Sequence, residues 1–168
     1  MKNKNVLQKI DSEANKKRIT WDVAARREIG EAVKLTLRKL DSKLSPEAID
    51  QLVYLEGERK PRRWKKNYAV FGSRVYPDIG VLMPTSRKRV AIELDHSGKR
   101  KTGIPGSDFK KALSKAAFCC LSNNWDYCYV LFYNQSGKPM DACLNRQLEK
   151  GILDRYCNEF HTKTIVLS

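Results

Sequence analysis

The sequence lacks the marks of several common enzyme and scaffold classes. Its two histidines, His96 and His161, are too few for the histidine-rich zinc sites of many hydrolases. It contains neither a glycine-rich phosphate loop nor a Gly-x-Ser-x-Gly turn. Its five cysteines are an odd number without Cys-x-x-Cys spacing, and most lie in apolar surroundings typical of buried free thiols. These features argue against structural zinc, a disulfide framework and the corresponding enzyme classes.

Long apolar segments are also missing. No apolar run approaches the roughly 20 residues that a membrane-spanning helix needs. The N-terminus starts with positive charge but has no apolar segment of signal-peptide length, so nothing marks the chain for export. We therefore expect a cytoplasmic protein without a membrane partner.

Positive charge is what the chain has in excess. The 33 lysines and arginines exceed the 19 acidic residues, which gives a formal net charge of +14. Such a surplus favours a polyanion as the binding partner. With 168 residues the chain has the length of one compact domain, so we expect a single domain over residues 1–168.

Hydrophobic spacing predicts helices in the first part of the chain. Apolar residues recur every three or four positions over residues 21–40, and Thr20 is placed to cap the start of this helix. Ser45 can cap a second helix with Pro46 in its first turn, and this helix is expected to continue through residues 52–55.

From residue 68 the apolar period changes to two, which predicts strands at residues 68–72, 78–83 and 89–95. A helix capped by Ser107, a strand over residues 127–133, another helix and a last strand over residues 164–167 follow. The expected inward faces of these two helices are Phe109, Leu113, Ala116, Ala117 and Cys120, and then Leu144, Leu148, Ile152 and Tyr156. The predicted fold is an α/β protein with a mixed central sheet flanked by helices.

Three carboxylates share one face of two predicted strands. A hairpin that turns between Thr85 and Ser86 places Asp78 opposite Glu93, and Asp95 follows on the same face. Opposed like charges destabilise a sheet unless a cation lies among them, and Mg²⁺ prefers hard oxygen ligands. The pattern therefore predicts a magnesium site. The alternative interpretation is that these are ordinary polar residues on the wet face of a half-exposed sheet.

A magnesium ion at this position indicates phosphodiester chemistry, because it polarises a phosphate and lowers the pKa of a bound water. Two basic runs flank the carboxylates in the sequence, which favours double-stranded DNA as the partner. The alternative is that each run is a solvated loop. The candidate DNA contacts are Arg59, Lys60, Arg62, Arg63, Lys65 and Lys66, with Trp64 available to stack, and then Lys99, Arg100 and Lys101.

At these residues the sequence resembles the PD-(D/E)XK nuclease superfamily, the fold of many restriction endonucleases. Pro77-Asp78 is similar to the PD element, and Glu93-Leu94-Asp95 occupies the place of the (D/E)-X-K element. The order of elements over residues 21–133 is similar to the family's αβββαβ core, with extra N-terminal helices before it. The resemblance implies a Mg²⁺-dependent endonuclease of the restriction type, acting as a homodimer or as the cutting subunit of a larger enzyme.

The sequence departs from the family at Asp95, which stands where a lysine is usual. The resemblance implies that a positive charge comes from the next helix, where Lys110, Lys111 and Lys115 are available and Lys111 is taken as the catalytic candidate. It also implies a glutamate from the first helix, for which Glu28 is the candidate. The alternative for the lysines is a solvated helix surface, and the alternative for Glu28 is a surface salt bridge.

Two other functions remain open at this point. A junction resolvase or repair nuclease would share the same metal chemistry. A non-catalytic DNA-binding protein would carry the replaced lysine as the mark of a dead site.

Overall fold

A five-stranded mixed sheet lies at the centre of the computed structural model. Its strands are β1 (Val53–Leu55), β4 (Ile79–Leu82), β5 (Arg89–Ser97), β6 (Tyr127–Asn134) and β7 (Thr162–Leu167), in the order β1-β4-β5-β6-β7. The first three strands are mutually antiparallel, whereas β5, β6 and β7 run parallel. The structure describes residues 2–58, 64, 69–70, 73–74, 76–97, 106–122, 124–136 and 147–167.

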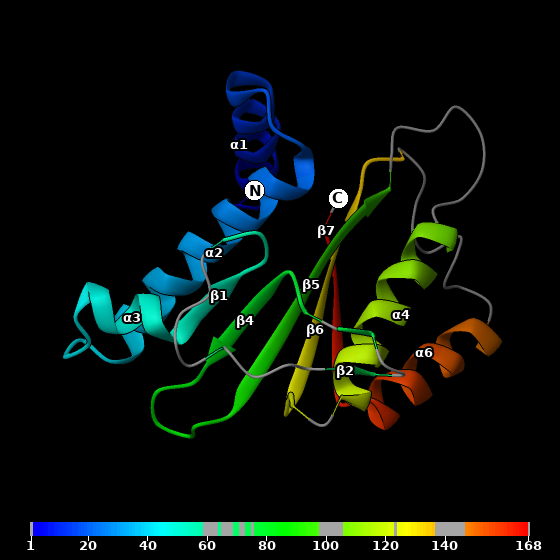
Figure 1. The fold of residues 1–168 in the computed structure, drawn as a ribbon. Coiled ribbons are helices and arrows are strands. Elements are labelled where there is room, and N and C mark those ends of the chain that lie inside the picture. Colours follow the sequence, from blue (N-terminus) through cyan, green and yellow to red (C-terminus); the bar gives the residue numbers. More distant parts are fainter. Residues whose placement is uncertain are drawn as a thin grey trace.

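Helices flank this sheet on both sides (Figure 1). They are α1 (Lys2–Lys17), α2 (Trp21–Leu40) and α3 (Pro46–Leu52) on one side, and α4 (Gly106–Leu121) and α6 (Gln147–Glu159) on the other. The predicted mixed sheet flanked by helices is therefore confirmed. Within the described ranges, no helix is both long enough and apolar enough to cross a membrane.

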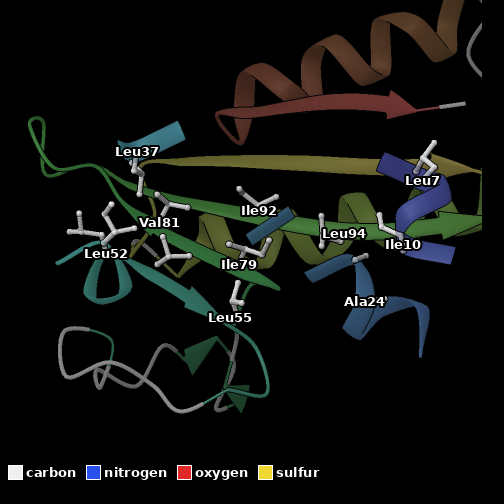
Figure 2. Close-up of a cluster of buried hydrophobic side chains, with 13 residues drawn as sticks. Leu7, Ile10, Ala24, Leu37, Leu52, Leu55, Ile79, Val81, Ile92 and Leu94 are labelled. Carbon is white, nitrogen blue, oxygen red and sulfur yellow. The ribbon is translucent and has the colours of Figure 1, made fainter. Parts of the chain in front are cut away.

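The alternation along β5 divides the interior into two hydrophobic cores. Ile92 and Leu94 belong to the core that α1, α2 and α3 cover, and Figure 2 shows this cluster extending along the sheet from Leu37 to Leu7. Ala91 belongs to the second core, which packs beneath α4. Both faces of β5 are therefore buried, as expected for a strand with a parallel neighbour.

Two helix starts have the predicted caps. The side chain of Thr20 accepts a hydrogen bond from the Val23 amide, and that of Ser45 accepts one from the Ala48 amide. Such caps satisfy amide groups that have no partner within the helix. The predicted starts of α2 and α3 are confirmed.

The predicted end of the second helix was wrong. The helix α3 ends at Leu52, and Val53–Leu55 form β1, paired antiparallel with β4. All three residues of β1 are buried. Their β-branched and large apolar side chains suit a buried strand, so pairing with β4 outweighs the local helical pattern.

The predicted strand at residues 68–72 is not part of the central sheet. Within the described residues, β2 (Ala69–Val70) pairs with β3 (Ser73–Arg74) in a separate two-stranded sheet. The strand that lies beside β4 is β1 instead.

The predicted inward faces of the two later helices are confirmed only in part, with Phe109 and Ala116 of α4 buried as expected. In α4 the fully buried positions include Ala112 and Cys119, whereas Leu113 and Cys120 are half-buried. In α6 the predicted Ile152 is 63% exposed, and Leu153 packs against the core. Leu144 lies outside the described residues. Because a helix turns by about 100° per residue, its neighbours in the fold decide which of two adjacent apolar positions is buried.

Candidate metal centre

The β4–β5 hairpin sets the spacing of the carboxylates. Ile79 pairs with Ile92 and Leu82 with Arg89, which is the predicted register. Asp78 directly precedes β4, so the same register places it opposite Glu93. Its Oδ2 accepts a hydrogen bond of 2.8 Å from the Leu94 amide, which holds its side chain against β5.

A third strand contributes another carboxylate to this row. Because Leu55 pairs with Ile79, the next residue, Glu56, lies opposite Asp78, and its amide donates to the Asp78 carbonyl at 2.9 Å. Glu56, Asp78 and Glu93 therefore follow one another across three strands. Sequence reasoning missed Glu56 because its strand was interpreted as helix, although Val-Tyr-Leu before it is typical of a strand.

The face that carries Asp78 and Glu93 is covered, which contradicts the alternative interpretation of a wet face on a half-exposed sheet. Asp78 is 7% exposed and Glu93 is 3% exposed. The parallel connection from β5 to β6 includes α4, and such a crossover puts its helix on the sheet. Asp78 and Glu93 consequently lie beneath α4 rather than in open solvent, whereas Asp95 is half-buried and Glu56 is exposed.

Desolvation and like charge raise the pKa of two of these carboxyl groups. Burial and the neighbouring Asp78 carboxylate raise the pKa of Glu93 to about 8. Burial and the same carboxylate also raise the pKa of Glu56. The Cys119 Sγ lies 3.2 Å from Oε1 of Glu93 and donates to it, and burial raises the pKa of this thiol. In the absence of a metal ion, Glu93 is therefore largely protonated at neutral pH.

Two cationic side chains approach the carboxylates from the helices on opposite sides of the sheet. Arg26 of α2 places Nη1 at 3.0 Å from Asp78 Oδ1 and at 2.6 Å from Glu56 Oε2. Lys115 of α4 places Nζ at 3.6 Å from Asp95 Oδ2. Burial lowers the pKa of Lys115, but the carboxylates of Asp78, Asp95 and Glu93 outweigh burial, so its pKa is raised.

The lysine that reaches the carboxylates is Lys115, and the candidate Lys111 lies one helical turn away and is exposed. Lys111, Lys115 and Cys119 are four residues apart and share one helix face. Cys119 contacts Glu93, and Lys115, one turn earlier on the helix, approaches Asp95. Lys111, one further turn away, therefore lies beyond Asp95. Lys110 is exposed as well.

The candidate Glu28 faces α1 instead of the carboxylates. It lines a surface recess together with Gln8, Lys9 and Ser12 of that helix. Arg26, two residues earlier on α2, is the side chain of this helix that contacts Asp78. His96 packs against the Trp21 ring, with the two ring centroids 4.3 Å apart.

The structure overturns one of the candidate DNA contacts. Trp64 is 3% exposed and stacks on Trp125, with ring centroids 5.6 Å apart. An indole buried in this way cannot stack on a DNA base, so the expected role of Trp64 was wrong. The other candidates lie outside the described residues, namely Arg59, Lys60, Arg62, Arg63, Lys65, Lys66, Lys99, Arg100 and Lys101.

One buried carboxylate oxygen without a hydrogen-bond partner suits a divalent cation. In the part of the chain that the structure describes, no three Asp, Glu, His or Cys side chains are grouped to hold a metal ion, so the predicted convergence of Asp78, Glu93 and Asp95 is not seen. Oδ2 of Asp95 is nevertheless buried without a hydrogen-bond partner, because Lys115 at 3.6 Å is too distant to donate. Such an oxygen is costly to bury, and Mg²⁺ would satisfy it with the hard carboxylate ligands that this ion prefers.

A cavity lies on the opposite face of the sheet, and its lining differs from that of the carboxylate row. Its volume is about 650 Å³, and its lining includes Ile29, Val33 and Leu37 of α2 with Val90 and Tyr129 of the sheet. This lining is mostly apolar and does not suit a phosphate group. The carboxylate row is therefore the better candidate for phosphodiester chemistry.

The chain matches no protein-family model, and no curated protein or solved structure is similar to it. The function is therefore inferred from the site itself.

Proposed function

We propose that the protein is a Mg²⁺-dependent DNA endonuclease of the PD-(D/E)XK type, either a restriction-type enzyme or the cutting subunit of one. The main support is the opposition of Asp78 and Glu93 on paired strands, with the oxygen of Asp95 that lacks a hydrogen-bond partner two residues further along β5. Further support is the order α2, β1, β4, β5, α4, β6, which is similar to the αβββαβ core of that family if α3, β2 and β3 are taken as additions.

In this proposal Asp78, Glu93 and Asp95 hold Mg²⁺. When bound, the ion polarises the scissile phosphate and lowers the pKa of an attacking water. Glu93 has to lose its proton to serve as a ligand, because its raised pKa keeps it protonated in the metal-free protein.

The two cations have separate roles. Lys115 supplies from α4 the positive charge that the family motif has at the position of Asp95, and it offsets charge on the phosphate. Arg26 offsets the repulsion between Asp78 and Glu56 when no metal is present, so it is a positioning residue for Asp78.

The proposed substrate is double-stranded DNA. The formal charge of +14 draws a polyanion toward the protein, and the basic runs around residues 59–66 and 99–101 are proposed as phosphate contacts. One metal centre cuts one strand, so cleavage of both strands requires a homodimer or a partner subunit.

The test is incubation of the purified protein with linear duplex DNA and Mg²⁺. We expect Asp78→Asn and Glu93→Gln to lower cleavage by at least about 100-fold, because a metal contributes several kcal/mol to transition-state stabilisation. Asp154→Asn, which changes an exposed carboxylate on α6, is the matched control and should cleave like the parent. Circular dichroism checks the fold, and DNA affinity without Mg²⁺ should remain.

Cleavage at the parental rate by both variants would contradict the metal assignment. Cleavage of branched DNA with no activity on linear duplexes would favour a junction resolvase or repair nuclease. DNA binding by a folded protein that cleaves neither substrate with Mg²⁺ would favour the non-catalytic alternative, in which Asp95 marks a dead site.

A further inference from the structure

Two thiols meet at the C-terminal end of α4. Sγ of Cys120, in the last turn of that helix, lies 2.8 Å from Sγ of Cys128, near the start of β6. Both cysteines are free thiols. A disulfide bond is about 2.05 Å long, so the two sulfur atoms need to approach by less than about 1 Å to become bonded. The fold therefore holds this pair close to bonding distance before any oxidation.

The surroundings of the two thiols differ in a way that suits disulfide exchange. Cys120 is half-buried, whereas Cys128 is fully buried. The hydrogen bond with Cys128 lowers the pKa of Cys120, and the same contact raises the pKa of Cys128. Cys120 is the more accessible of the two, so its thiolate is the nucleophile that a small disulfide can reach.

The other described cysteines have different surroundings. Cys119 is fully buried and donates to Glu93, and its raised pKa keeps it a thiol. Cys157, on α6, has Thr164 as its polar neighbour. Cys143 lies outside the described residues.

We propose that Cys120 and Cys128 are a reversible redox modification site that a small disulfide, such as oxidised glutathione, converts into an intramolecular disulfide. The Cys120 thiolate attacks the glutathione disulfide, which forms a mixed disulfide and releases one glutathione thiolate. Cys128 then gives up its proton and attacks the Cys120 sulfur, which releases the second glutathione. The protein loses two electrons and two protons, and one glutathione disulfide becomes two glutathione thiols.

This modification site adjoins the candidate metal centre. Cys119, next to Cys120 on α4, donates to Glu93. A disulfide between Cys120 and Cys128 would fix the last turn of α4, which carries Cys119, against β6. The Cys119 thiol would then move away from Glu93 less easily when a metal ion binds. This step rests on the proposed nuclease function, and we expect the oxidised protein to need a several-fold higher Mg²⁺ concentration for half-maximal cleavage. An unchanged Mg²⁺ requirement in a fully oxidised, active sample would overturn this coupling.

The disulfide itself is tested on the full-length protein without DNA or Mg²⁺, so the result does not depend on nuclease activity. The protein is treated with oxidised glutathione, its remaining thiols are blocked with N-ethylmaleimide, and its mass and peptides are analysed. We expect two thiols to be lost, a peptide pair linked through Cys120 and Cys128, and full reversal by dithiothreitol.

Matched variants separate this pair from the other thiols. Cys120→Ser, at a half-buried position, should fold and form no intramolecular disulfide. A variant with both Cys143→Ser and Cys157→Ser should form the same disulfide as the parent. The proposal is overturned by a lasting glutathione adduct on Cys120, by a link to a different cysteine, or by no thiol loss in the folded parent.

Discussion

The burial of Glu93 should make the stability of the metal-free protein depend on pH. Glu93 is 3% exposed, and burial followed by the charge of Asp78 raises its pKa from 4.5 to about 8. In the unfolded chain this carboxyl group ionises near its ordinary pKa, so the unfolded state loses the proton first as the pH rises. The contribution of Glu93 to stability is therefore complete below about pH 4.5 and is lost as the pH rises to about 8.

The size of this effect follows from the two pKa values. Each pKa unit corresponds to about 1.4 kcal/mol, so ionisation of Glu93 should lower the free energy of unfolding by about 4 kcal/mol between acid and about pH 8. Glu93→Gln keeps the shape of the side chain and cannot ionise. The variant should therefore resemble the parent near pH 4.5 and exceed its stability by up to about 4 kcal/mol near pH 8.

The assay is urea unfolding with a metal chelator present, followed by circular dichroism over this pH range. Glu159→Gln, which changes an exposed carboxylate at the end of α6, should keep the parental pH dependence. Addition of Mg²⁺ near pH 8 should stabilise the parent but not Glu93→Gln, because the ion binds the ionised carboxylate. Parallel loss of stability in the parent and Glu93→Gln would refute the argument that burial holds the proton on Glu93.

Asp95→Asn should raise the Mg²⁺ concentration needed for cleavage, because an amide is a poorer ligand than a carboxylate; an unchanged magnesium titration would remove Asp95 from the ligand set. Lys115→Ala should lower the cleavage rate by about 100-fold and Lys111→Ala by less than about threefold, and equal losses would contradict the placement of Lys115. Gly80→Ala should destabilise the protein by about 1–3 kcal/mol in thermal unfolding, since its Cβ would lie 2.8 Å from a tryptophan ring. Gly151→Ala, whose Cβ meets no atom within 4 Å, is the matched control and should not lower the midpoint.

Local patterns were enough to predict the parts of the fold that neighbours in sequence determine. Thr20 and Ser45 cap their helices as expected, because a cap depends on residues only two or three positions away. The β4–β5 register was also predictable, since a short turn and the alternation of Ile79 and Val81 leave one pairing that buries the apolar face.

Most of the features that the sequence patterns did not predict arise from contacts between distant segments. Val53–Leu55 became a strand because it pairs with β4, and this pairing brings Glu56 to Asp78. Arg26 and Asp78 are 52 residues apart, so no local pattern joins them. The choice of Lys115 over Lys111 depends on how α4 is rotated on the sheet, and both lysines satisfy the same sequence pattern.

The alternation of residues along the chain puts Asp78, Glu93 and Asp95 on one face of a hairpin, because side chains of a strand point to opposite faces in turn. The burial of Asp78 and Glu93 on this face follows from the packing of distant segments. The crossover from β5 to β6 lays α4 over it, which removes water from Glu93, raises its pKa to about 8 and brings Lys115 toward Asp95. Desolvation depends on every segment packed around a group, so it is a property of the assembled fold rather than of any stretch of the chain.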